Sequence, residues 1–222
     1  MEKQRICIVG DGLSGLTAAI ALDNLSNVDV HLISRKITKK QDRRTTAISE
    51  SNFNFLIDNF NSLNKKMFWP SKHIQLFYET NKNKINFLNI SEDKNNLMYV
   101  FENDKIKNIL VKEIKKKKIK ISYKDIKSIN ELKDYELIIL CLGGNSKIYR
   151  STVKGRSINK DYKEVAITGY VKHKIKDLNT SQFFLKEGPL AILPFSKNNF
   201  SFVWSVKKDF YNSHTKKIIK LI

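Results

Sequence analysis

The apolar and polar positions of the first 33 residues follow the order strand, glycine turn, helix and strand. An apolar run at residues 5–9 ends in a glycine-rich turn, and helix-forming residues without a breaker follow at 16–25. The alternation of residues 28–33 is typical of a second strand. Because two neighbouring strands connected through a helix run parallel, we expect a βαβ unit here.

The rest of the chain contains both helical and extended patterns. Two further helices are predicted where apolar residues recur at helical spacing, at residues 46–60 and 105–118. Strands are predicted from short apolar or alternating runs at residues 74–78, 85–90, 137–142, 165–171, 190–194 and 200–206. The run at 137–142 is apolar throughout, which is typical of a strand covered on both faces.

This order of elements predicts an α/β fold. We expect a Rossmann-like parallel sheet for nucleotide binding, interleaved along the chain with a smaller β-rich substrate domain. Residues 1–66 and 98–158 are assigned to the nucleotide-binding domain, and residues 67–97 and 159–222 to the β-rich domain.

The composition is that of an ordinary globular chain. Of the 222 residues, 41% are hydrophobic and 28% are charged, which excludes wholesale disorder. No apolar run reaches the roughly 18 residues of a membrane-spanning helix, and no signal-peptide core is present, so we expect a cytoplasmic protein. Cys7 and Cys141 lie in separate apolar runs and the histidines are isolated. Buried reduced thiols and no metal site are therefore expected.

The chain is strongly basic, with 41 Lys and Arg against 22 Asp and Glu, a formal net charge of +19. Such a charge favours polyanionic partners such as nucleic acid or an anionic membrane. The lysines are spread from end to end, however, and a nucleic-acid role rests on charge alone, so we do not expect one. The densest run, at residues 115–118, ends a predicted helix, where cations complement the helix dipole.

Gly10, Gly12 and Gly15 have the G-x-G-x-x-G spacing directly between a predicted strand and a predicted helix. One glycine allows the tight turn, one lets a pyrophosphate approach the backbone, and one allows close helix packing. The start of the helix, with Leu13 and Ser14, would then face the phosphates with its free N–H groups. These five residues are our candidate dinucleotide-binding site.

The end of the second predicted strand lacks the acid that usually binds the adenosine ribose. Ser34 and Arg35 stand there instead. An arginine near a lost acid accommodates the 2′-phosphate of NADP in related folds. The βαβ unit taken alone is therefore compatible with either NADP or FAD.

Several blocks in the chain resemble, in order, the ubiquinone-biosynthesis hydroxylases, which are FAD-dependent aromatic monooxygenases related to para-hydroxybenzoate hydroxylase. The D-x-R-t-t-A-x-S block and the G-P-L-A-x-L-P block are more specific than the glycine motif. The blocks are residues 10–15, 42–49, 98–103, 137–146, 188–194 and 203–205.

This resemblance implies FAD as cofactor, NAD(P)H as reductant, and a polyprenylated phenol as the substrate that is hydroxylated. It implies that Arg44 faces the cofactor phosphates and that Asn103 lies beside the flavin. Gly143 belongs to the family's Asp-Gly pair, which is Leu142-Gly143 here. The segment with Gly188, Pro189 and Leu190 would form part of the substrate sheet; a turn before an edge strand is the other interpretation of Gly188-Pro189.

A polyprenyl phenol resides in the bilayer, so the resemblance also implies peripheral attachment to an anionic membrane surface, with other ubiquinone-pathway proteins as candidate partners. The family's Gly-Asp flavin segment has no counterpart before Ile222, so we expect a C-terminally truncated or degenerate relative. Two alternatives remain: a flavin monooxygenase for another aromatic substrate, and a noncatalytic assembly or lipid-handling relative.

Overall fold

The computed structural model describes residues 3–35, 42–81, 83–143, 148 and 160–221, with the backbone alone for 215–221. The chain divides into two compact units. The first comprises residues 1–42, 57–63 and 104–159, and the second comprises residues 43–56, 64–103 and 160–222. Each unit is therefore built from separate stretches of the sequence. Compared with the domains expected from the sequence, residues 43–56, 64–66 and 98–103 group with the second unit.

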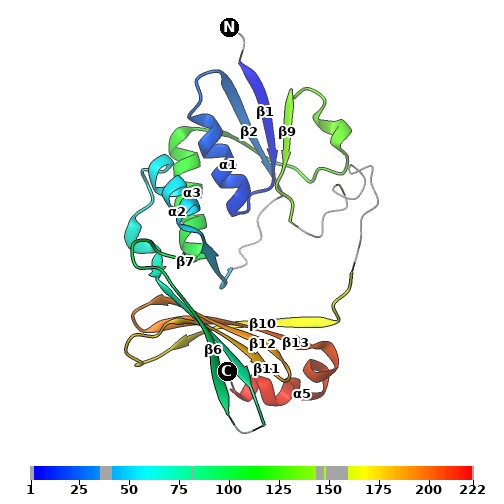
Figure 1. The fold of residues 1–222 in the computed structure, drawn as a ribbon. Helices are drawn as coiled ribbons and strands as arrows, with labels where there is room; N and C mark the ends of the chain where they lie inside the picture. The colour runs from blue at the N-terminus through cyan, green and yellow to red at the C-terminus, as the bar shows by residue number, and fades with distance from the viewer. Residues whose placement is uncertain (1–2, 36–41, 82, 144–147, 149–159, 222) are drawn as a thin grey trace. The chain divides into compact units, whose positions relative to one another are not determined.

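The first unit contains a four-stranded parallel sheet in the order β8-β2-β1-β9. Its strands are β1 (Gln4–Val9), β2 (Val28–Ser34), β8 (Lys120–Tyr123) and β9 (Leu137–Leu140). Helix α1 (Leu13–Asp23) connects β1 to β2 and lies against both strands (Figure 1). The predicted βαβ unit is thus confirmed.

Helix α3 (Asn103–Lys117) shows the apolar face that its sequence predicts. Ile106, Leu110 and Ile114, spaced by four residues, are fully buried, and three lysines occupy the last turn. A short 3₁₀ helix, η2 (Ile129–Leu132), begins with a capping box between Ser128 and Glu131.

The second unit contains two sheets. The larger has six strands in the order β10-β13-β12-β11-β5-β6, and the smaller has the order β3-β7-β4. The strands of the larger sheet are β5 (His73–Glu79), β6 (Lys84–Ser91), β10 (Glu164–Lys172), β11 (Thr180–Leu185), β12 (Gly188–Ser196) and β13 (Asn199–Lys207). The smaller comprises β3 (Thr45–Ile48), β4 (Trp69–Ser71) and β7 (Met98–Glu102). Other helical elements of the described residues are α2 (Glu50–Asn59), η1 (Lys65–Met67) and α5 (Lys208–Leu221).

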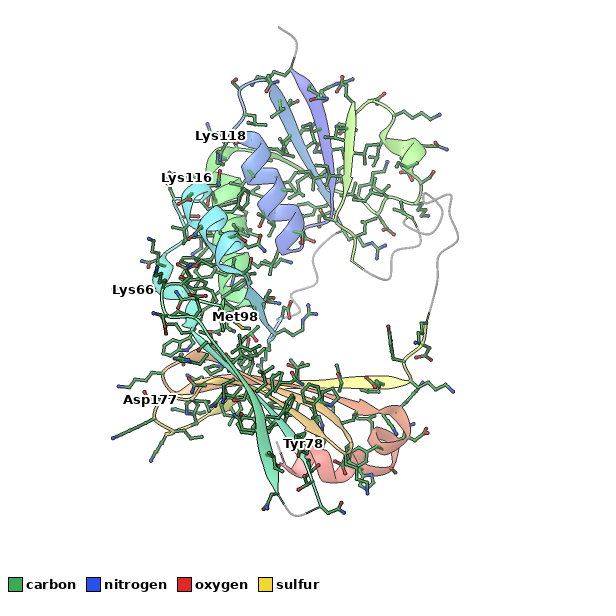
Figure 2. The ribbon with its side chains drawn as sticks, in the orientation of Figure 1. Lys66, Tyr78, Met98, Lys116, Lys118 and Asp177 are labelled. Carbon is green, nitrogen blue, oxygen red and sulfur yellow. The ribbon has the colours of Figure 1, made fainter. Side chains whose placement is uncertain are left out.

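Stacked aromatic rings form a core within the second unit. Phe53 and Tyr99 stack with ring centroids 3.7 Å apart, and Phe68 meets Phe53 and Phe101 edge-on at 5.3 Å. Tyr78 on the outer hairpin, by contrast, is 41% exposed (Figure 2). In the part of the chain that the structure describes, no helix is long and apolar enough to cross a membrane.

Two expectations about elements are wrong. The helix expected at residues 46–60 begins only at Glu50, because the β-branched residues before it form β3 and pair with β7. The strand expected to be covered on both faces, β9, ends at Leu140, and none of its residues is fully buried, with Leu137 43% exposed.

Candidate functional site

The glycine turn lies at the carboxyl end of β1, and two of its glycines are required by sterics. Gly10 has φ +118°, and a Cβ there would lie 2.2 Å from the carbonyl oxygen of Cys141. A Cβ on Gly15 would lie 1.9 Å from the carbonyl oxygen of Gly10. Side chains at either position would therefore push apart the turn, α1 and the segment after β9.

Gly12 differs from its neighbours because a Cβ there would meet no atom within 4 Å. It is the N-cap residue of α1, in extended conformation, and no side chain caps this helix. The N–H groups of the first helical turn have no partners within the helix, and they form the positive end of its dipole. The absence of a side chain at Gly12 thus leaves space in front of groups that attract an anion.

A cavity of about 850 Å³ lies at this edge of the sheet. That volume falls within the range of small-molecule and cofactor pockets. The walls come from the carboxyl ends of all four parallel strands of the first unit: residues 9–14, 33–35, 124–126 and 140–143, with Ile148. The carboxyl end of β1 is a topological switch point, because β2 pairs with one side of β1 and β9 with the other.

The cavity brings together seven of the residues that the sequence predicted for cofactor binding. Gly10, Gly12, Leu13, Ser14, Ser34, Arg35 and Gly143 all line it. Gly143 has φ +69°, a conformation that favours glycine. Gly15 packs against the turn and is not part of the lining.

At the end of β2 the side chains are engaged in local contacts. Ser34 is buried, and its hydroxyl donates to the carbonyl of Arg35 at 2.9 Å. The Arg35 Nε donates to Asp125 Oδ1 at 2.7 Å, in an ion pair that is exposed on both sides. The backbone N–H of Lys124 donates to the carbonyl of Ser34 at 2.8 Å, which joins the segment after β8 to the end of β2.

Two more ion pairs border the cavity. Lys124 Nζ lies 2.7 Å from Glu131 Oε2, and this bond, together with backbone N–H donors, lowers the pKa of Glu131 to about 2. Asp11, within the glycine turn, lies 3.4 Å from Lys107 Nζ of α3, and both side chains are partly exposed. The cavity rim therefore contains charges of both signs.

Lys107, Lys124, Asp125 and Ile126 were not predicted from the sequence to lie at this site. The last three follow β8, a strand of four residues whose sequence KISY shows little periodicity. The only local signal was Asp125, an acid shortly after Ile119 and Ile121. Its position beside the cavity depends on the pairing of β8 with β2.

The two cysteines are free thiols. Cys7 is fully buried in β1, and burial raises its pKa to about 11. Cys141 is partly buried, and burial raises its pKa as well. Both thiols are therefore protonated at neutral pH and poor nucleophiles. Among the described residues, no group of three or more His, Cys, Asp and Glu side chains is placed to hold a metal ion.

Arg44 and Asn103 lie together in the second unit, at paired ends of β3 and β7. The backbone N–H of Asn103 donates to the carbonyl of Arg44 at 3.0 Å. The Asn103 side chain is buried and accepts a hydrogen bond from the Thr46 hydroxyl at 2.7 Å. Asn103 thus has a structural role in this unit.

The predicted substrate segment of Gly188, Pro189 and Leu190 opens β12, also in the second unit. Gly188 has φ +136°, and a Cβ there would lie 1.9 Å from the carbonyl oxygen of Ser205. Since β12 lies between β13 and β11, the interpretation of Gly188-Pro189 as a turn before an edge strand is wrong. Pro189 is tolerated because it stands at the beginning of the strand.

A scan against protein-family models and a search of curated proteins both find no match for this chain. Solved structures do match. One is CmlS, a flavin-dependent halogenase, with a TM-score of 0.74 and 15% identity over 98% of this chain and 44% of that one. Another is the tetrameric form of 2-methyl-3-hydroxypyridine-5-carboxylic acid oxygenase, with a TM-score of 0.75 and 16% identity over 94% of this chain and 60% of that one.

This chain has the fold of flavin-dependent oxygenases and halogenases. A further structure with this fold is CtdE in complex with FAD, with a TM-score of 0.63 and 15% identity over 93% of this chain and 60% of that one. The chain spans 44% to 60% of the length of these three proteins. The expected α/β fold is thus confirmed, and the likeness at these identities concerns the fold.

Proposed function

We propose that the first unit binds FAD and that the chain is part of a flavin-dependent monooxygenase that hydroxylates an aromatic ring. The observation that carries this proposal is the cavity at the carboxyl ends of β1, β2, β8 and β9, with the bare Gly12 and the uncapped start of α1 in its wall. CmlS is described as flavin-dependent and CtdE as a complex with FAD, which supports FAD over other dinucleotides.

The residues present fit the pyrophosphate part of FAD. A Cβ on Gly12 would occupy the space in front of α1, whereas glycine leaves that space open. Leu13 and Ser14 would hold the phosphates through backbone N–H groups, assisted by the helix dipole. Gly10 and Gly15 allow the helix and the turn to pack closely enough to present these groups. Bound flavin would supply the redox chemistry, and the protein would orient it and exclude water.

The narrower function that we propose is hydroxylation of a polyprenylated phenol in ubiquinone biosynthesis, with NAD(P)H as reductant. It rests on the order of the sequence blocks, including the segment at Gly188, Pro189 and Leu190, which would contribute to the substrate wall. The proposed lipid-tailed substrate also implies a peripheral membrane location and contact with other proteins of that pathway.

A noncatalytic relative is the second candidate. It is favoured by Ser34 and Leu142, which stand where the related enzymes have acids that contact the cofactor. Flavin retention discriminates between the two, because a noncatalytic relative that uses the fold only for assembly or lipid handling has no need of the cofactor.

Titration of the purified chain with FAD, followed by quenching of flavin fluorescence, tests the proposal. We expect saturable binding by the wild-type chain and a loss of at least about tenfold in affinity in Gly12→Val, because the valine side chain would occupy the pyrophosphate space. Circular dichroism should show the same fold in both proteins, since the substituted Cβ meets no neighbour. Equal affinity of the two proteins for FAD would contradict the assignment.

A further inference from the structure

The end of β2 lacks the acid that binds a ribose in dinucleotide folds, and the structure places another carboxylate beside it. Strands β2 and β8 are parallel, with Ser34 in register with Tyr123. The next residues of both strands therefore leave the sheet at the same edge. Arg35 follows β2 and Asp125 follows β8, and the two side chains meet at 2.7 Å.

Asp125 is held in place by the residues on either side of it. Lys124 is bonded through its backbone N–H to the carbonyl of Ser34, and its side chain is paired with Glu131. Ile126 is 4% exposed and belongs to the buried cluster that includes Val9 and Ile33. The side chain of Asp125 nevertheless remains 58% exposed, and Asp125 lines the cavity together with Arg35 and the glycine turn.

Ser34 is not equivalent to the missing acid, because its side chain is only 3% exposed. Its hydroxyl donates to the Arg35 carbonyl, which leaves the oxygen as the acceptor. A neutral hydroxyl also binds a diol more weakly than a carboxylate does, since hydrogen bonds to charged groups are the stronger ones.

We propose that Asp125 supplies the carboxylate that holds the adenosine ribose of the cofactor, in place of the acid that β2 lacks. This inference rests on the proposed function. The two ribose hydroxyls donate to the carboxylate, and the guanidinium of Arg35 orients it from the other side through Nε. Because a carboxylate in this position repels a phosphate on the ribose, the site selects an unphosphorylated ribose, as in FAD, over the 2′-phosphorylated ribose of NADP.

The test uses ADP, 2′-deoxy-ADP and ADP bearing a 2′-phosphate as probes, with affinities for the full chain measured by isothermal titration calorimetry. Wild-type protein should bind ADP about tenfold more tightly than 2′-deoxy-ADP, the effect of one hydrogen bond to a charged group. It should also bind ADP more tightly than the 2′-phosphorylated probe, because the carboxylate repels the added phosphate. Asp125→Asn should lose about this factor for ADP and should no longer distinguish ADP from 2′-deoxy-ADP. Asp125→Glu, which keeps the carboxylate, should retain part of the discrimination.

Glu136→Gln is the matched control. Glu136 forms a similarly exposed ion pair with Arg5, at 3.8 Å. That pair lies at the amino ends of the strands of the same sheet, where β1 and β9 begin, away from the cavity at their carboxyl ends. This variant should bind all three probes as the wild type does. An equal loss of ADP affinity in Glu136→Gln and Asp125→Asn would overturn the assignment, because any surface carboxylate would then have the same effect.

The outcomes separate this inference from the proposed function. No binding of ADP to the wild-type chain would overturn both. Binding of ADP with undiminished discrimination in Asp125→Asn would overturn the role of Asp125 alone. Tighter binding of the 2′-phosphorylated probe, lost in Arg35→Gln, would also overturn it, because Arg35 would then be the residue that reads the ribose.

Discussion

At the residue scale, the three glycines of the turn have different physical roles. A Cβ on Gly15 would lie within 1.9 Å of a carbonyl oxygen, and a Cβ on Gly12 would meet nothing within 4 Å. In this motif Gly10 and Gly15 are therefore needed for close packing, whereas Gly12 is needed to leave space for the cofactor phosphates.

This difference predicts opposite outcomes for the smallest substitution. Gly15→Ala should lower the free energy of unfolding by roughly 2 kcal/mol or more, because the turn and α1 must move apart. Gly12→Ala should change it by no more than about 0.5 kcal/mol, since φ is −70° there and the site is open. Urea unfolding of both variants measures the two values. Similar destabilisation by both would contradict this division of roles.

His31, on β2 of the first sheet, is a residue whose titration the fold shifts near neutral pH. Burial, and then the positive charge of Lys120, lower its pKa below the ordinary 6.5, partly opposed by Asp29. The ring nitrogens contact the Tyr135 hydroxyl and the Ser122 hydroxyl, the latter at 2.8 Å. The folded state therefore favours the neutral imidazole.

The sign of the resulting pH dependence follows from this direction. Below pH 6.5 the unfolded chain binds a proton at His31 that the folded chain resists, so stability contributed by this residue is present above pH 6.5 and is lost as the pH falls. An NMR titration of the imidazole C–H signals should place the midpoint of His31 below 6.5. A midpoint above 6.5 would show that the environment favours the charged ring instead.

At the element scale, the C-terminal end of α3 is the densest basic feature of the sequence. Lys115, Lys116 and Lys118 are exposed, and Lys116 and Lys118 lie at the surface there (Figure 2). Lys117 instead bonds Asp23 at 3.1 Å and Asn24 at 2.7 Å, which fixes α3 to the end of α1. Three of the four lysines are thus available for an anionic surface.

If α3 contributes to membrane attachment, the chain should sediment with anionic liposomes at low salt and be released at high salt. Each lysine near such a surface contributes about 1 kcal/mol, so replacing Lys115, Lys116 and Lys118 by glutamine should weaken binding roughly a hundredfold. The control replaces the exposed Lys65, Lys66 and Lys94, which removes the same charge elsewhere. Equal weakening by both triple variants would mean that diffuse charge, not α3, binds the membrane.

The elements also show what the sequence can and cannot predict. The β1-α1-β2 unit was predictable because its periodicity and its glycines are local signals. Strand β3 could not be predicted, because it forms by pairing with β7 more than 50 residues away in the sequence. The role that we assign to Asp125 could not be predicted either, because β8 is short and only its tertiary pairing places it beside β2.

At the scale of the whole molecule, both units are assembled from segments far apart in the chain. The first unit gathers its cavity from residues as distant as Val9 and Ile148, and the second pairs β5 with β11 across about 100 residues. Interleaving of two domains was expected from the change of pattern along the sequence. Where the chain passes from one unit to the other could not be predicted, because it depends on contacts and not on local composition.

The central claim is that the cavity at the carboxyl end of the parallel sheet binds the ADP part of FAD. Titration of the ¹⁵N-labelled chain with ADP, followed by the backbone amide signals in NMR, tests it most directly. We expect saturable shifts at Gly12, Leu13 and Ser14 and in the segments after β2 and β8. No shifts, or shifts confined to residues of the second unit, would contradict it.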